Sequence, residues 1–205
     1  MKKHIALMTL CGALILTAGC ASNSVEMVDT RNDTGAAVAG IDYRDFENAA
    51  SKAVQSLLAS GAVTNPKGGR YVLMISRMTN DTMQRIDTDQ LVKKIRVDLL
   101  NSGRVVVTTA VGANGPEDAA SMQTREALRG NAEFDQSRVQ RKGTLQAPDL
   151  SLSGKIIQRN VPMSKDRVQI EYYFQLSMTD LSSGLAVWEQ ETPIIKRARG
   201  DTATW

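Results

Sequence analysis

The chain has 205 residues, 42% of them hydrophobic, with 25 basic and 22 acidic side chains, which is enough for one globular core. Its one histidine is His4 and its two cysteines are Cys11 and Cys20, so a chain cleaved before Cys20 keeps no histidine and cannot form an internal disulfide. This composition excludes Ser-His-Asp triads, Cys-His pairs and the common zinc sites, while carboxylate-only chemistry stays formally open. We therefore expect a protein that is not an enzyme and that holds no metal or cofactor.

The first 20 residues predict a bacterial lipoprotein signal. Residues 1–4 are basic, and residues 5–17 form an apolar run of 13, whereas a membrane-spanning helix needs about 20. Residues 16–20 resemble a lipobox, with Leu16 one position earlier than the usual pattern. The resemblance implies a signal peptide over 1–19, lipid attachment at Cys20 and, because Ala21 follows, delivery to the outer membrane. The alternative is an ordinary signal peptide that contains Cys20.

Removal of the signal leaves a chain that is nearly neutral. Loss of Lys2 and Lys3 takes the 25 basic residues to 23, against 22 acidic ones, so we expect no attraction to nucleic acid. Residues 20–41 are small and polar without an apolar period, and they predict a disordered tether. Fully extended, about 20 residues reach at most roughly 70 Å. Residues 42–205 are predicted to form one globular domain.

A helix is predicted from Asp42, as its N-cap, to about Ser60, with Gly61 ending it. One face of this helix is apolar and Ala-rich, and the opposite face lacks an excess of basic residues. That pattern favours packing on a sheet over lying on a membrane surface. The apolar face consists of Phe46, Ala49, Ala50, Ala53, Val54, Leu57 and Leu58.

A strand, a helix and a second strand are predicted between residues 70 and 111. Residues 70–78 form a short apolar run, which is followed by the turn-forming residues 79–82. Asp87 suits a helix N-cap in a capping box with Gln90, and Gly103 suits the helix C-terminus. The apolar stripe of this helix is Leu91, Val92, Ile95, Leu99 and Leu100, and residues 104–111 form the second strand. A unit of this length predicts two parallel strands joined by a right-handed crossover helix.

A weaker helix is predicted after this unit. Pro116 suits its first position, and its apolar stripe, which runs to about Leu128, is sparse. Residues 129–148 are polar and predict a partly ordered excursion. Its cations Arg138, Arg141 and Lys142 are interpreted as a solvated face in preference to a binding patch.

The last third of the chain predicts three strands. Residues 149–158 alternate in polarity, and residues 168–178 carry six apolar side chains in strict period two, so one face is buried. Residues 180–184 predict a hairpin turn with Gly184 in the left-handed region, and residues 185–191 return as a strand. Together these helices and strands predict a single α+β domain with a mixed sheet of about five strands flanked by helices. We expect the protein to be a monomer.

The order of these features resembles the LpoB family of penicillin-binding protein activators. The resemblance runs from about residue 42 to 196 and rests on the lipobox, the tether, Asn80-Asp81-Thr82, Ser102-Gly103-Arg104, and a late hairpin with Gly184 and Trp188. It implies a fold similar to the N-terminal domain of TolB. It also implies a non-enzymatic lipoprotein of the outer membrane that faces the periplasm. Such a protein would bind the periplasmic domain of a class A penicillin-binding protein and stimulate peptidoglycan synthesis.

A second function is compatible with the same fold. The best-known activators have a long Pro-rich tether, whereas residues 20–41 are few and contain no proline. The alternative is an envelope assembly or secretion accessory lipoprotein that binds another periplasmic protein.

The candidate partner-binding residues lie at the end of the predicted central strand. They are Arg77, Asn80, Asp81, Thr82 and Arg85. A sheet holds such a strand-end loop rigidly, and charged side chains around it can steer a partner. The alternative is that Asn80 and Thr82 bond the local backbone and only shape the turn.

Overall fold

A computed structural model of the protein describes residues 27–30 and 32–199. Internal contacts divide the chain into two units, residues 1–35 and residues 36–205. In the first unit, the described residues 27–30 and 32–35 form no helix or strand. The predicted signal peptide and Cys20 lie outside the described residues. Every helix and strand below belongs to the second unit.

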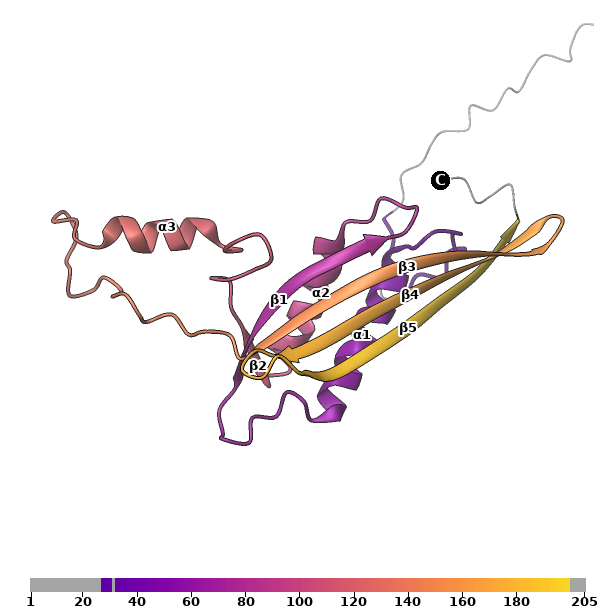
Figure 1. The fold of residues 1–205 in the computed structure, drawn as a ribbon. Coiled ribbons are helices and arrows are strands. Elements are labelled where there is room, and N and C mark those ends of the chain that lie inside the picture. Colours follow the sequence, from indigo (N-terminus) through magenta and orange to yellow (C-terminus); the bar gives the residue numbers. More distant parts are fainter. Residues whose placement is uncertain (1–26, 31, 200–205) are drawn as a thin grey trace, which may run out of the picture. The chain divides into compact units, whose positions relative to one another are not determined.

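A five-stranded mixed sheet is the framework of the second unit (Figure 1). Its strands are β1 (Tyr71–Asp81), β2 (Val105–Val107), β3 (Leu150–Ser164), β4 (Arg167–Asp180) and β5 (Ala186–Arg199), in the order β2-β1-β3-β4-β5. β1 is parallel to both β2 and β3, while β4 is antiparallel to β3 and β5. The predicted α+β class with a mixed five-stranded sheet is confirmed.

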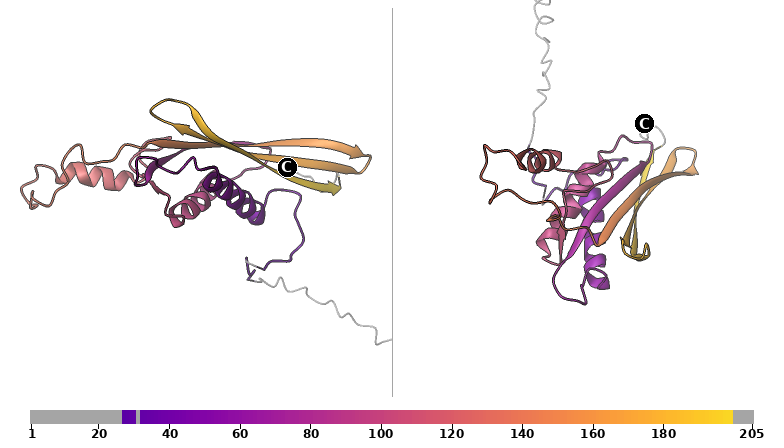
Figure 2. Two further views of the ribbon diagram at one scale, coloured as in Figure 1. Left: turned by 90° about the horizontal axis from the view of Figure 1, so that it is seen from below. Right: turned by 60° about the vertical axis from the view of Figure 1, so that its left-hand side comes forward.

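Two helices, α1 (Tyr43–Ser60) and α2 (Thr88–Asn101), lie on the same face of the sheet (Figure 2). Local chemistry sets the ends of α1 as predicted. The Asp42 carboxylate accepts the backbone N–H groups of Arg44 and Asp45, the Asp45 carboxylate accepts the N–H of Asp42, and Gly61 has a φ of 78°. The two parallel strands β1 and β2 flank α2 in sequence, which confirms the predicted strand–helix–strand unit.

The core lies between these helices and the inner face of the sheet. Three alanines on α1 let the helix approach closely, and the alternating apolar side chains of β4 fill the sheet side. Its largest fully buried side chains include Leu57, Leu73, Leu91, Ile95, Leu99, Leu152, Tyr172, Phe174 and Met178. Gly154 on β3 faces this core, and a Cβ added there would lie 2.6 Å from both Met78 Sδ and Leu176 Cδ2.

The α2 stripe differs from the prediction at two positions. Leu91, Ile95 and Leu99 are buried, but Leu100 is 44% exposed and Arg96 is buried in its place. At 100° per residue, Arg96 falls within the angular range of the predicted stripe and Leu100 at its edge, so the buried stripe is narrower than the predicted one and includes a charged side chain. In place of the capping box with Gln90, the Asp87 carboxylate accepts the backbone N–H of Asp89.

The strand lengths also differ from the predicted ones. β3 and β5 continue to Ser164 and Arg199, well past the predicted ends at 158 and 191, because every added residue except Met163, where the register shifts, pairs with β4. β1 continues through Asp81, so three of the four predicted turn residues are in the strand. β2 is only three residues long, because the chain turns away after Thr108 donates to the Leu73 carbonyl.

Residues 108–148 form an arm that includes α3 (Ala119–Leu128) and extends beyond the end of the sheet (Figures 1 and 2). Asp118 caps α3 by accepting the Ser121 backbone N–H, so Pro116 precedes the helix instead of starting it. No α3 residue is buried, as its sparse apolar stripe predicts. The Gln136 side chain ties the following turn together by donating to the carbonyls of Leu128, Asn131 and Phe134.

Candidate functional site

The end of β1 and the turn after it hold the predicted partner-binding residues, and two of them shape the turn. The Asn80 side-chain oxygen accepts from the Thr82 hydroxyl at 2.7 Å and from its backbone N–H at 3.2 Å. The Asn80 amide donates to the Gln84 carbonyl at 2.8 Å, and the Thr82 hydroxyl accepts the Gln84 backbone N–H at 3.2 Å. These bonds close the turn on itself, which is the local role that the sequence offered as the alternative for Asn80 and Thr82.

Gln84 then joins this turn to two distant parts of the domain. Its side-chain oxygen accepts the Ile41 backbone N–H at 2.9 Å and the Tyr172 hydroxyl at 3.3 Å. Burial, with a smaller contribution from the Asp45 carboxylate, raises the pKa of Tyr172 to about 12. The hydroxyl therefore stays protonated and able to donate at any physiological pH.

The three charged candidates have separate surroundings. Asp81 pairs with Lys155 on β3 at 2.7 Å, and both side chains are about half exposed. Arg77 lies at an irregularity in the pairing of β1 with β3, between Ile75 and Met78, and is exposed. Arg85 is exposed on the turn, where Met83 is 64% exposed. The structure thus leaves Arg77, Met83 and Arg85 as the prominent outward side chains of this region.

Arg77 also lines a cavity of about 550 Å³ beside α2. The cavity lies between residues 75–78 of β1, the first half of α2 and residues 112–117. Both terminal nitrogens of Arg96 donate to the two carboxylate oxygens of Glu117 at its wall. The Arg96 side chain is 9% exposed, and its buried Nε has no partner among the described residues. This pair could not be predicted from the sequence, because 21 residues separate its members and no motif links them.

Acidic and thiol side chains do not gather into a metal site within the described residues, where no cluster of three or more metal-ligating side chains occurs. Within the same residues, no helix combines the length and the apolar character needed to cross a bilayer. The remaining candidate, the lipid acceptor Cys20, lies outside the part of the chain that the structure describes.

Comparison with known proteins gave one family and several solved structures. Residues 45–194 match the family described as "Peptidoglycan-synthase activator LpoB", while no curated protein was found to match the sequence. The LpoB C-terminal domain from Salmonella enterica is 13% identical, with a TM-score of 0.43, and the alignment covers 73% of this chain and 98% of that chain. The Escherichia coli LpoB C-terminal domain is 12% identical, with a TM-score of 0.41 and the same coverage of 73% and 98%.

Lipoprotein GNA1162 from Neisseria meningitidis is also similar, at 12% identity and a TM-score of 0.36, with 65% of this chain and 87% of that chain covered. The family match spans α1 and all five strands through most of β5, which is well over half of the chain. The chain therefore belongs to the LpoB family of peptidoglycan-synthase activators.

Proposed function

We propose that this protein is an outer-membrane lipoprotein that binds the periplasmic part of a class A penicillin-binding protein and stimulates its synthesis of peptidoglycan. The observation that carries the proposal is the family match over residues 45–194. The protein acts by binding and is not itself an enzyme. This agrees with a chain that has no histidine after His4 and no cysteine after Cys20.

Lipid at Cys20 anchors the protein, which faces the periplasm as a monomer. Mass spectrometry of the purified wild type tests the anchor: a triacylated Cys20 at the N-terminus is expected, and an unmodified N-terminus would contradict it. Cys20→Ala removes the acyl acceptor, so the precursor stays uncleaved or reaches the wrong compartment. Zymography tests the absence of catalysis, since clearing of peptidoglycan by the pure protein would overturn that part of the proposal.

The partner surface in this proposal is the end of β1 with the turn that follows. Asn80 and Thr82 hold the turn in shape, Asp81 is oriented by Lys155, and Arg77 and Arg85 present exposed charges on either side. Exposed Met83 adds an apolar side chain between these charges. Methionine and arginine are enriched at protein interfaces, whereas the rim charges mainly set the orientation and the rate of encounter.

Charge reversal tests this surface. We expect Arg77→Glu combined with Arg85→Glu to weaken binding to a detergent-solubilised class A synthase at least tenfold, or about 1.4 kcal/mol, by calorimetric titration. Both side chains are exposed, so the melting temperature should stay nearly constant. Stimulation of glycan polymerisation should fall in parallel with binding.

The matched control is Lys67→Glu combined with Arg104→Glu, which makes the same charge change before the first residues of β1 and β2. Equal affinity of the wild type and the Arg77/Arg85 variant would remove this surface from the proposal. Cross-linking in intact envelopes provides the wider test. Capture of a different periplasmic protein, with no class A synthase bound, would favour an assembly or secretion accessory role.

A further inference from the structure

We propose that an extended segment of the synthase adds to the sheet as a strand beside β1, at the edge that β2 leaves open. The inference rests on the proposed function, because it takes the class A penicillin-binding protein as the partner. It goes further by assigning the mode of binding, which is backbone pairing with residues 74–81, and the charge of the segment, which is acidic.

β1 has a free edge over more than half of its length. In the described part of the chain, β2 is the one strand on that side, and it pairs only with residues 71–73. The last rung of this ladder joins the Thr108 N–H to the Leu73 carbonyl at 2.9 Å. The next would join the Ala110 N–H to the Ile75 carbonyl, but Ala110 donates to the Thr108 hydroxyl at 3.2 Å instead. Figure 1 shows the rest of β1 as the border strand of the sheet.

The backbone groups of Ile75 and Met78 point toward this open edge. The Leu73 carbonyl bonds on the β2 side while the Leu73 side chain lies in the core. In a strand, the direction of the backbone groups alternates together with the side-chain face. Ile75 and Met78 also have their side chains in the core, so their N–H and C=O groups face the same edge as those of Leu73.

A cavity lies along the same edge. It is the cavity of about 550 Å³ that residues 75–78 share with α2 and residues 112–117. Its volume is within the range of about 300–1,000 Å³ that is usual for binding sites. Arg77, Lys93 and Asn114 line it and are exposed, so the cavity opens to solvent. An incoming chain therefore has room beside β1 without displacing the core.

The charges around the cavity favour an acidic segment. Arg77 and Lys93 line it, and neither side chain forms an ion pair or a hydrogen bond within the residues that the structure describes. Of the two acids in the lining, Glu117 is already bonded to Arg96, which leaves Asp89. Cations thus outnumber acids among the side chains still available. A carboxylate on the incoming segment would gain charge-assisted hydrogen bonds from these cations.

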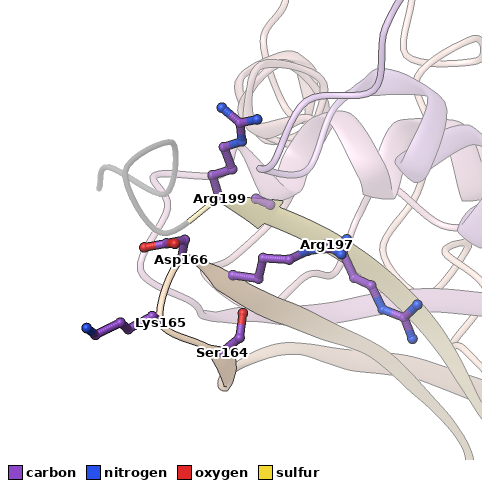
Figure 3. Close-up of a pocket in the computed structure, with 7 residues that line it drawn as sticks. Ser164, Lys165, Asp166, Arg197 and Arg199 are labelled. Carbon is purple, nitrogen blue, oxygen red and sulfur yellow. The ribbon is translucent and has the colours of Figure 1, made fainter.

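The opposite edge of the sheet is less suited to strand addition. β5 contains Pro193, which lacks a backbone N–H, and proline is a common protection of edge strands, whereas residues 74–81 contain none. The hollow of about 860 Å³ near the end of β5 is lined by strand residues that already pair, Ser164 with Arg167 and Arg167 with Arg199. Figure 3 shows Lys165 and Arg199 there pointing away from one another, so they do not converge on one segment.

Hydrogen exchange tests the backbone pairing directly. The mature lipoprotein, alone and bound to detergent-solubilised class A synthase, is exchanged and read by mass spectrometry at single-amide resolution. We expect the Ile75 and Met78 amides to exchange at least tenfold more slowly in the complex, because each gains a carbonyl acceptor. The Thr79 amide, which alternates toward β3, is the control and should change little.

The outcomes separate this inference from the proposed function. A complex that forms and stimulates synthesis without slowing these amides would overturn strand addition and leave the proposed function intact. Amides that are already slow in the free protein would show that another segment of this chain or a second copy occupies the edge, which would also overturn it. A wild type that does not bind the synthase would contradict the proposed function and this inference together.

A bulky side chain in the cavity should block the segment. Ala113 lines the cavity and is exposed, so Ala113→Trp should fill the space with little change in melting temperature. We expect it to weaken synthase binding at least tenfold, or about 1.4 kcal/mol. Ala132→Trp is the matched control, because Ala132 is exposed on the arm away from the cavity. Wild-type affinity of Ala113→Trp would overturn the proposal.

A charge reversal tests the acidic character of the segment. Lys93→Glu should weaken synthase binding at least threefold, because it turns an attraction at the cavity into a repulsion. The control Lys52→Glu makes the same change on the exposed side of α1 and should leave the affinity unchanged. Equal affinities of the two variants would overturn the charge assigned to the segment.

Discussion

Arg96 and Glu117 form a two-pronged ion pair that ties α2 to the first part of the arm, before α3. The guanidinium is nine-tenths buried, whereas the carboxylate is about half exposed. Removing a partner from a buried charge is costly because the remaining charge stays desolvated. The pair is therefore a polar link between α2 and residues 112–117.

We expect Glu117→Gln to lower the free energy of unfolding by about 1–2 kcal/mol, less than for a fully buried pair because Glu117 is partly in water. Urea unfolding measures the change. The control is Glu133→Gln on the exposed turn of the arm, which should alter stability by less than about 0.5 kcal/mol. In the double variant with Arg96→Met the two losses should not add, and simple additivity would mean that the pair does not couple.

Gly154→Ala should destabilise the sheet by about 1–3 kcal/mol through overpacking. The new Cβ would meet Met78 Sδ and Leu176 Cδ2 at 2.6 Å and the Gln175 carbonyl oxygen at 2.7 Å, and the backbone oxygen cannot move easily. Ser153→Ala, one residue earlier on β3, is the control. If the melting temperatures of both variants lie within about one degree of the wild type, the core rearranges to accept the added Cβ and the prediction is wrong.

Asn80→Ala should lower the free energy of unfolding by about 1–2 kcal/mol, because it removes the acceptor for Thr82 and the donor to the Gln84 carbonyl. Asp81→Asn provides the comparison, since it weakens only an exposed ion pair with Lys155 that is worth less than about 1 kcal/mol. Denaturant unfolding measures the free energy of unfolding of both variants, and the loss should be larger for Asn80→Ala. A larger loss for Asp81→Asn would mean that the bonds within the turn are not what stabilises it.

The raised pKa of Tyr172 predicts that the folded protein loses stability at alkaline pH. Burial raises its pKa from 10 to about 12 in the folded protein, so between these pH values the unfolded chain releases a proton that the folded chain keeps. The contribution of this group is therefore complete below about pH 10 and is lost as the pH rises toward about 12.

Tyr172→Phe should flatten this decline, when urea unfolding is compared at about pH 9 and about pH 11.5. Near neutral pH the same variant should cost at most about 1 kcal/mol, because Gln84 keeps its bond from Ile41. Tyr71→Phe controls for the loss of a phenol elsewhere in the sheet. Parallel alkaline declines for the wild type and Tyr172→Phe would contradict the assignment.

The sequence by itself determined the elements whose signals are local. Asp42 and Gly61 set the ends of α1 because caps act within one turn of the backbone. The strict alternation of residues 168–178 set the buried face of β4, because successive strand side chains point to opposite faces. The order of strand, helix and strand was enough to predict that β1 and β2 are parallel.

Only the tertiary structure decided the relationships between residues far apart in the chain. Burial of Arg96 in place of Leu100 depends on how α2 lies across the sheet, and Gln84 bonds to Ile41 and Tyr172, which are 43 and 88 residues away. The ends of β3 and β5 mix polar and apolar residues and each contains a proline, and pairing with β4 extends them because the ladder supplies backbone bonds largely independent of the side chains. That same pairing places Arg167 opposite Arg199, two residues that are far apart in the sequence.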